Sequence, residues 1–503
     1  MNFERLKIMP EEKEKLAIPN ETIQISSKLQ KHGFEAFLVG GCVRDILSGK
    51  EPKDWDLTTN AKPKEIQKIF PNSFYENSFG TVGVKTESEN PTLAVIEITP
   101  YRLEEKYTDK RHPDKVKFTD KLEDDLARRD FTINAIALSI KNENPKDYEI
   151  VDPFNGQKDL KHGIIRAVGD ANERFNEDAL RIIRAIRFVS EFNFSIEDKT
   201  KESLRNNADL LKLISKERIR DEFAKTINSD SPDVGLEIMR ELGILKHVLP
   251  ELEEGWGVTQ NKEHIYTVWE HNIRALKHAA ENKWPLKIRL SALLHDVGKP
   301  RTKKGEGHDS TFYGHDVVGG KITAQALKRL KFPNKIIEDV AKLVRWHLFF
   351  SDTEVITLSA VKRIIRHVGE ENIWNLMKVR YCDRVGMSRP KERPFRLRKY
   401  ESMIEEALRS PLSVTQLTVN GEDVIKIAKI EPGPKVGYIL HILLEEVIED
   451  ESLNNREYQE KRVEELNRLD EKELQKMGEY AKNVKQAIEQ KEVETIRKKY
   501  FVR

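Results

Sequence analysis

The stretch from Phe37 to Thr58 reads FLVGGCVRDILSGKEPKDWDLT. Its apolar start predicts a strand that leads into Gly40 and Gly41, whose missing side chains let backbone N–H groups come close to a phosphate. A helix is predicted to follow, with Arg44 on its first turn. The stretch therefore predicts a strand–turn–helix unit that is suited to a phosphate group.

Two carboxylates come next, in the short extended run Asp54-Trp-Asp56-Leu. Because alternate residues of a strand point to one face, we expect both carboxylates to leave the same face. Such a pair can hold two Mg²⁺ ions together with substrate phosphate oxygens. A lone Gly-Gly or Asp-x-Asp is usually a turn or a solvated strand end, but their joint occurrence favours function. We predict Asp54 and Asp56 as catalytic, magnesium-binding residues of a nucleotidyl transfer.

These residues resemble the signature of the class II nucleotidyltransferases, the family of CCA-adding enzymes and bacterial poly(A) polymerases. The resemblance extends over most of the chain, through the segments Glu97–Arg102, Arg128–Asn134, Asp152–Gly156 and Glu177–Arg181. It implies an α+β fold, in which a nucleotidyltransferase head with a small mixed sheet precedes all-helical regions. The expected domains are a catalytic head at 1–140, a neck and body at 141–255, an HD domain at 256–390 and a tail, a candidate RNA contact, at 391–503.

Arginines supply the predicted charge for a triphosphate. Arg129 ends a predicted short helix at Leu122–Arg129, and its guanidinium fork matches phosphate oxygens in pairs. If Glu177–Val189 is one helix, three arginines share a surface apart from its apolar stripe. Like charges repel at this spacing, so the row indicates an anionic partner. The alternative is a surface helix with solvated arginines. The row comprises Arg181, Arg184 and Arg187.

In the resembling family, the Asp and Arg of a Glu-Asp-x-x-Arg motif read the Watson–Crick edge of the incoming CTP or ATP. Carried over to this chain, these residues are Asp178 and Arg181. The positions that match the family's other nucleotide contacts are Gly41, Arg44, Arg129, Arg184 and Arg187.

The segment Tyr101–Asp120 is basic and shows no periodicity, which predicts a mobile loop near the active site. In the resembling family, a loop at this place is associated with the change from adding C to adding A, and it tends to be shorter in enzymes that add only C. Its length here favours an enzyme that incorporates A. A plain solvated connection is the alternative.

Histidines gather after Trp256. Their order resembles the H…HD…D pattern of the HD metal-dependent phosphohydrolases, with His315 and His347 as the extra ligands of binuclear members. Imidazole and carboxylate together suit Mn, Fe, Ni or Zn better than Mg. Two alternatives stay open, namely an active phosphohydrolase and a degenerate domain that keeps its helices for structure. The expected ligands are His271, His295, Asp296 and Asp383.

Composition bounds these predictions. A chain of 503 residues predicts two to four domains, and its net charge of only +2 means that any surface for nucleic acid must come from segregated charge. The two cysteines, Cys42 and Cys382, lie far apart in sequence, which favours a reducing cytoplasm. The N-terminus carries charges throughout, and no apolar run is long enough to span a membrane, so we expect neither signal peptide nor anchor.

The resemblance implies a CCA-adding tRNA nucleotidyltransferase. The tRNA 3′-hydroxyl would attack the α-phosphate of CTP or ATP and release pyrophosphate, with magnesium held by Asp54 and Asp56. No protein partner is evident. Three alternatives are a poly(A) polymerase or A-only adding enzyme, an HD phosphohydrolase with an RNA-binding head, and an inert RNA-binding protein.

Overall fold

The computed structural model describes residues 16–75, 80–105, 115–261, 265–349, 356–389, 391–409 and 413–502. Its contacts divide the chain into two compact units. The first comprises Met1–Arg345 with Cys382–Arg389, and the second comprises Trp346–Tyr381 with Pro390–Arg503. These units do not test the four predicted domain limits, which stay a prediction.

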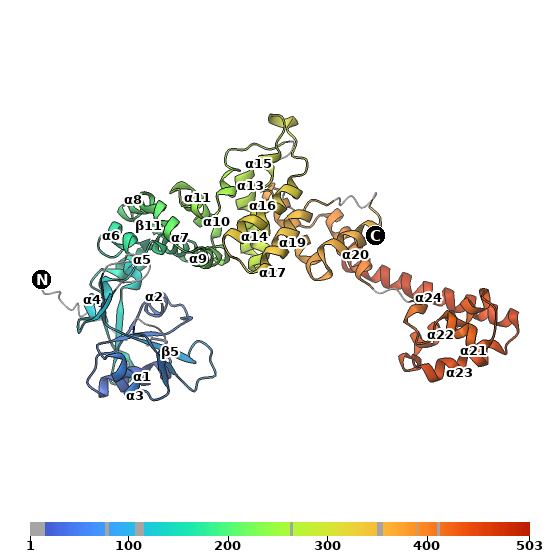
Figure 1. Cartoon of the computed structure of the whole chain (residues 1–503), viewed down its shortest axis with the longest axis horizontal. Helices are drawn as coiled ribbons and strands as arrows, with labels where there is room; N and C mark the ends of the chain where they lie inside the picture. The colour runs from blue at the N-terminus through green and yellow to red at the C-terminus, as the bar shows by residue number, and fades with distance from the viewer. Residues whose placement is uncertain are drawn as a thin grey trace. The chain divides into compact units, whose positions relative to one another are not determined.

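The head of the first unit is built on a mixed sheet, as predicted (Figure 1). Within the described residues, its seven strands lie in the order β3-β4-β5-β2-β1-β8-β9. β2 and β5 are parallel, with Asp56 beside Glu97, while the other pairs are antiparallel. The strands are β1 (Phe37–Val39), β2 (Asp56–Thr59), β3 (Ser73–Tyr75), β4 (Val82–Lys85), β5 (Val95–Pro100), β8 (Ala137–Lys141) and β9 (Asn144–Val151).

Strand alternation places the two faces of β1 in different cores. Leu38 packs with apolar residues of the helices α1 (Asn20–Lys31) and α3 (Pro63–Ile69). Phe37 and Val39 point the other way and pack with α4 (Leu122–Ala127). The sheet is thus covered on both faces, and the helix α2 (Gly41–Leu47) starts directly after β1 at the Gly-Gly pair.

The predicted loop Tyr101–Asp120 is only partly correct. Its flanks, β6 (Arg102–Glu105) and β7 (Lys115–Phe118), form an antiparallel ribbon with Arg102 opposite Phe118. Main-chain hydrogen bonds explain the difference, because they form in a ribbon whatever side chains the strands carry. Residues 106–114, at the tip, lie outside the described residues, so the predicted mobility of the loop is not tested.

The rest of the first unit is helical, as expected, and shares one large apolar core (Figure 1). Phe188 and Val189 of the neck helix pack there with residues of the later helices. A short parallel pair, β10 (Ile164–Ile165) and β11 (Ser195–Ile196), joins the neck. The helices are α5 (Gly156–His162), α6 (Ala171–Glu177), α7 (Leu180–Phe192), α8 (Asp198–Asn207), α9 (Lys216–Asn228), α10 (Pro232–Glu241), α11 (Leu245–Val248), α12 (Pro250–Glu253), α13 (Val268–Glu281), α14 (Leu286–Leu294), α15 (Lys299–Thr302), α16 (His315–Arg329) and α17 (Asn334–Trp346).

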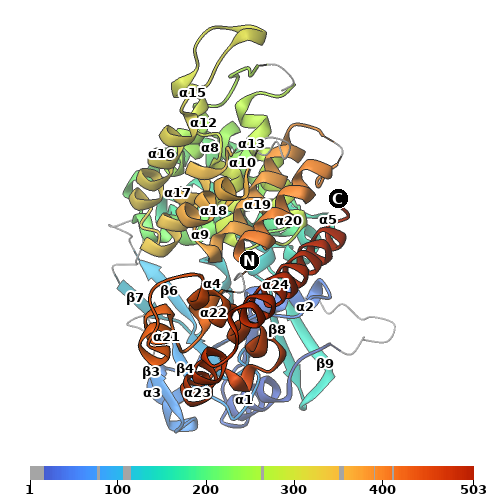
Figure 2. The ribbon, with the colours of Figure 1, turned by 90° about the vertical axis from the view of Figure 1, so that its right-hand side faces the viewer.

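The second unit contains a helical tail with its own core. Figure 2 shows the long helix α24 beside α22, and Gly478 explains their close crossing. A Cβ at Gly478 would lie 2.6 Å from Cβ of Tyr438, so a larger residue would force the helices apart. The helices are α18 (Leu358–Val368), α19 (Glu370–Gly386), α20 (Phe395–Leu408), α21 (Gly421–Ala428), α22 (Pro434–Glu449), α23 (Arg456–Asn467) and α24 (Glu471–Lys499).

Among the described residues, none of the helices combines the length and the apolar character that a bilayer crossing requires.

Candidate active site

A cavity of about 750 Å³ lies in the first unit, where the head meets the neck helix α7. Its wall includes seven of the residues predicted for the nucleotidyl transfer site. Those residues are Gly41, Arg44, Asp54, Asp56, Arg129, Arg184 and Arg187. The structure therefore brings together side chains that lie more than 130 residues apart in the sequence.

The Gly-Gly pair lies between the predicted metal ligands and two arginines. Gly40 has a φ of 75°, in the left-handed region that favours glycine. A Cβ at Gly40 would lie 3.0 Å from Nη1 of Arg129 and 3.9 Å from Oδ2 of Asp56. A Cβ at Gly41 would lie 3.7 Å from Oδ1 of Asp54. Bare backbone thus leaves space beside both carboxylates.

The prediction that Asp54 lies on a strand is wrong. The chain bends at Lys53 and Asp54, after Pro52, and β2 starts only at Asp56. Burial of the Trp55 side chain, which is 4% exposed, fixes this bend and leaves Asp54 exposed at the cavity. Both carboxylates still line the cavity, and two carboxylates with open space for phosphate oxygens suit magnesium.

Glu97, a residue that could also support a metal, stands apart from this group. It pairs in register with Asp56 and is exposed, but it is not part of the cavity wall. A role for Glu97 in metal binding therefore has no support from the cavity.

The two head arginines are held by carboxyl and amide groups. Arg44 donates from Nη1 to Oδ1 of Asn134 (2.9 Å) and from Nε to Oδ1 of Asp45 (2.9 Å). Arg129 pairs with the buried Asp125 at 3.3 Å. Burial alone would raise the pKa of Asp125, but Arg128 and Arg129 outweigh it and hold that pKa below its usual range. Asp125 thus stays ionised and orients the guanidinium of Arg129.

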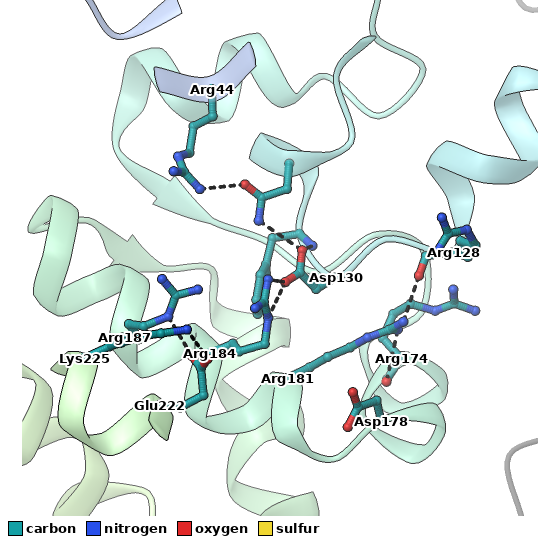
Figure 3. Close-up of polar contacts among 12 residues, drawn as sticks. Arg44, Arg128, Asp130, Arg174, Asp178, Arg181, Arg184, Arg187, Glu222 and Lys225 are labelled. Atoms are coloured by element: carbon teal, nitrogen blue, oxygen red, sulfur yellow. Dashed lines mark hydrogen bonds and ion pairs between the residues drawn. The ribbon is translucent and has the colours of Figure 1, made fainter. Parts of the chain in front are cut away.

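Asp130 links the head to the neck (Figure 3). Its Oδ2 accepts a hydrogen bond from Nε of Arg184 (2.8 Å), and its Oδ1 accepts one from Nδ2 of Asn134 (3.0 Å). Burial opposes ionisation, but Arg184 and Asn134 hold the pKa of Asp130 well below its usual range. A continuous polar chain therefore runs from Arg44 through Asn134 and Asp130 to Arg184.

The arginine row of α7 is neutralised by protein carboxylates. Arg184 pairs with Asp130 at 2.6 Å, and Arg187 pairs with Glu222 at 2.6 Å and with Glu191 at 3.0 Å. The predicted anionic partner thus includes Asp130 of the head, Glu222 of α9 and Glu191 of α7 itself. Because these acids already balance the charge, the arginine row alone does not indicate a bound phosphate.

The prediction of one helix over Glu177–Val189 is also wrong. Helix α6 ends at Glu177 and α7 begins at Leu180, with Asp178 in the extended bend between them. The carboxylate of Asp178 causes the new start, because its Oδ1 accepts a hydrogen bond from the backbone N–H of Leu180 (3.0 Å). A short polar side chain at this position competes with helix continuation.

The structure does not hold Asp178 and Arg181 side by side. Asp178 pairs with Arg218 at 2.8 Å, whereas Arg181 donates to the backbone oxygen of Arg128 at 2.8 Å and pairs with Glu177 at 2.9 Å. Neither residue is part of the cavity wall, and Figure 3 shows their side chains pointing apart. Their reading of the base stays a prediction.

A second cluster in the first unit unites four of the predicted HD ligands. Nε2 of His271 lies 2.8 Å from Nε2 of His295, 3.3 Å from Oδ2 of Asp296 and 3.3 Å from Oδ1 of Asp383. His271, His295 and Asp296 are all buried and satisfy the geometry of a metal-binding group. The residues come from α13, from the end of α14 and from α19.

Two histidines of this cluster turn Nε2 toward its centre. Nδ1 of His295 lies 2.7 Å from the backbone oxygen of Ala292, which directs Nε2 toward His271 and the carboxylates. Nδ1 of His315 has the same relation to Phe312, and its Nε2 lies 3.3 Å from Oδ1 of Asp296. This donor set fits a transition metal.

A lysine ammonium contacts one carboxylate of this cluster. Lys299 contacts Oδ2 of Asp296 at 2.6 Å, and this ammonium, with His295, holds the pKa of Asp296 well below its usual range although burial opposes it. His347 is buried but belongs to the second unit, so its role as a ligand stays a prediction.

Comparisons with known proteins match three parts of the chain. Residues 36–166 match the poly A polymerase head domain, residues 193–255 match the probable RNA and SrmB-binding site of polymerase A, and residues 263–388 match the HD domain. A CCA-adding enzyme of Lactococcus lactis is 34% identical over 448 residues, which cover 87% of this chain and 96% of the relative. The chain belongs to the family of CCA-adding enzymes and bacterial poly(A) polymerases.

Other members of the family include an A-adding tRNA nucleotidyltransferase of Deinococcus radiodurans, which is 33% identical over 423 residues and 82% of this chain. The crystal structure of the Bacillus stearothermophilus CCA-adding enzyme in complex with CTP is similar with a TM-score of 0.56 and 28% identity, over 90% of this chain and 98% of that one. Membership of the family implies a divalent metal in the head.

Proposed function

We propose that the chain is a CCA-adding enzyme, which transfers CMP and AMP from CTP and ATP to the 3′-hydroxyl of tRNA. One observation carries the proposal, namely a single cavity that unites Asp54 and Asp56 with a Gly-Gly pair and four arginines. A relative that shares 34% identity over most of this chain is a CCA-adding enzyme, which supports the choice of substrate.

The two carboxylates would hold magnesium, which when bound neutralises the triphosphate and lowers the pKa of the attacking hydroxyl. The residues of the chain supply position and charge. Arg44 and Arg129 flank the glycines, so they would hold the triphosphate while the 3′-oxygen of the primer bonds to the α-phosphorus. The 3′-hydroxyl loses its proton to solvent, the bond from the α-phosphorus to the bridging oxygen breaks, and pyrophosphate leaves. Arg184 and Arg187, whose charges are already paired with carboxylates, would line the neck side of the site.

Base selection would fall to Asp178 and Arg181, which present a carboxylate acceptor and a guanidinium donor close together in the sequence. Because Arg181 now contacts the backbone of Arg128 and Asp178 is held by Arg218, reading a base requires Arg181, or Asp178 together with Arg218, to move toward the cavity. A Watson–Crick edge offers a matching donor and acceptor, which would favour that movement.

The HD cluster favours a second candidate activity, metal-dependent hydrolysis of phosphate esters. The convergence of His271, His295, Asp296 and Asp383 on one point supports it. Manganese, iron, nickel or zinc would suit these donors, and when bound would activate a water molecule for attack on phosphorus.

We also infer a reducing compartment such as the cytoplasm. Cys42 and Cys382 are both buried and free. Burial, with the nearby charge of Asp56, raises the pKa of the Cys42 thiol to about 12, which keeps it neutral and unreactive beside the active site.

The direct test is incorporation of labelled CMP from CTP into tRNA that lacks its CCA end. Wild type should incorporate it, and Asp54→Asn and Asp56→Asn should each reduce the rate at least about a hundredfold, because each removes half of the charged metal ligands. Asp209→Asn, which changes an exposed carboxylate outside the cavity wall, is the control. Undiminished incorporation by both active-site variants would refute the assignment of this site.

A further inference from the structure

One stripe of the neck helix α7 faces the cavity. Arg184, Phe188 and Phe192 are four residues apart, so they lie on one helix face, and all three are part of the cavity wall. The helix ends at Phe192, because Asn193 adopts the left-handed conformation with a φ of 56°. The ring of Phe192 therefore stands at the end of the neck helix, beside the head.

This ring contacts two cations that the head supplies. Cζ of Arg44 lies 4.6 Å from the centroid of the Phe192 ring, and Nζ of Lys50 lies 4.8 Å from it. Cζ of Arg44 is also 5.4 Å from the ring of Phe188. These distances lie within the range of attraction between a cation and an aromatic face.

The ring is itself held in place by aromatic neighbours. Phe188 stacks on Phe192 with centroids 5.8 Å apart and an interplanar angle of 22°, and Phe194 lies 5.5 Å away at 43°. Among the described residues, the head cations contact the rings of Phe188 and Phe192 but not that of Phe194. Phe192 thus combines a fixed ring with two cation contacts.

The polar contacts of Arg44 do not fully fix the orientation of its guanidinium plane. Asn134 and Asp45 bind the guanidinium at its edge, which fixes its place in the plane but does not prevent rotation out of that plane. A ring on one face prevents that rotation. Lys50 is exposed at the rim, and the same ring gives its flexible side chain a preferred place.

We propose that Phe192 is a positioning residue of the nucleotide site, which orients Arg44 and Lys50 toward the triphosphate. The inference rests on the proposed nucleotidyl transfer. Since the ring touches cations and no group assigned to base reading, its effect is the same for CTP and ATP. Because Phe192 belongs to the neck, binding of the triphosphate by the head also depends on the neck.

The test compares Phe192→Leu with Phe194→Leu, which removes a neighbouring ring from the same aromatic group without removing a cation contact. We expect Phe192→Leu to raise KM for both CTP and ATP about three- to tenfold, as the loss of two cation–ring contacts predicts, with kcat changed less than about twofold. Phe192→Tyr should restore the wild-type KM. Phe194→Leu should lower the unfolding midpoint to a similar extent and leave KM unchanged.

Two further measurements separate the outcomes. In the Arg44→Ala and Lys50→Ala double variant, Phe192→Leu should have almost no further effect on KM, because its partners are gone. Equilibrium titration of each variant with ATP and CTP measures the affinity difference between wild type and Phe192→Leu directly, even if no incorporation occurs. An inactive wild type would refute the proposed function, whereas equal affinities of wild type and Phe192→Leu, or an equal loss in Phe194→Leu, would refute the role of Phe192.

Discussion

Asp178 and Arg218 form a two-point ion pair, with Nη2 of Arg218 2.8 Å from Oδ2 and Nη1 3.3 Å from Oδ1 of the carboxylate. The two residues are 40 positions apart, in the bend before α7 and on the first turn of α9. A guanidinium fork that binds both oxygens fixes the plane of a carboxylate. Arg218 therefore determines where the predicted base-reading carboxylate points.

Removal of Arg218 should impair nucleotide selection. We expect Arg218→Gln to lower the preference for CTP and ATP over UTP and GTP about tenfold or more, because a freely rotating Asp178 no longer presents a defined acceptor. Incorporation of each of the four nucleotides measures this directly. Arg205→Gln is the control, since Arg205 pairs with Glu241 at an exposed site and at 3.5 Å. Unchanged selectivity in Arg218→Gln would show that Asp178 does not depend on this pair.

Asp130 should make the stability of the first unit depend on pH. Its pKa is lower in the folded protein than the value of about 3.9 in unfolded chains, so its contribution to the free energy of unfolding is complete above that value. The contribution disappears as the pH falls through the folded pKa. We expect Asp130→Asn to cost about 3 kcal/mol at pH 7, because it leaves the charge of Arg184 without its carboxylate, and less below pH 4.

Denaturant unfolding of the first unit at pH 7 and pH 3, for wild type and for Asp130→Asn, measures this difference. Asp209→Asn is a matched control, since it removes an exposed carboxylate that pairs with Lys212 and Lys246, and it should have a much smaller effect. A difference between wild type and Asp130→Asn that stays constant between the two pH values would show that the charge of Asp130 does not contribute.

Local patterns predicted the start of the head well. The apolar run, the glycines and the alternating carboxylates indicated the order strand, turn, helix and strand, which the structure confirms except for the place of Asp54. These features depend on near neighbours in the sequence, whose chemistry determines the backbone directly.

Contacts over long sequence distances were not predicted. The partnership of Arg218 with Asp178 and that of Asp130 with Arg184 join residues 40 and 54 positions apart, and no local spacing indicates them. The break before the neck helix could have been predicted from Asp178, because an Asp that precedes an apolar run often starts a helix. Asn134 lay within a quoted motif, but its position between Arg44 and Asp130 follows only from the tertiary fold.

The HD cluster should bind a transition metal independently of the head. We expect purified wild type to contain close to one Mn, Fe, Ni or Zn ion per chain, and His295→Ala to lose it, because His295 and His271 supply the imidazole nitrogen donors. Elemental analysis by mass spectrometry measures the content. His278→Ala, which changes a half-buried histidine of α13 outside the cluster, is the control, and CMP incorporation should persist in both variants. Equal metal content in wild type and His295→Ala would refute this site.

Gly156 should be intolerant of any side chain. A Cβ there would lie 2.1 Å from the backbone oxygen of Thr132 and 2.8 Å from Cγ1 of Ile136, so Gly156→Ala must displace the backbone next to Asp130. We expect it to reduce the free energy of unfolding of the first unit by about 1–3 kcal/mol. Gly437→Ala, at a helical position with open space, should be neutral or stabilising in the second unit. Thermal unfolding that is unchanged by Gly156→Ala would contradict the close approach.

The most direct test of the central claim is extension of a tRNA that ends at its discriminator base, with CTP alone, with ATP alone, and with both. We predict addition of CC with CTP, little addition with ATP alone, and addition of CCA followed by a stop when both are present. Sequencing of the product ends reads the result. A long A tract from ATP alone would show a poly(A) polymerase, and addition of a single A only to tRNA that already ends in CC would show an A-adding enzyme; either result would contradict our account.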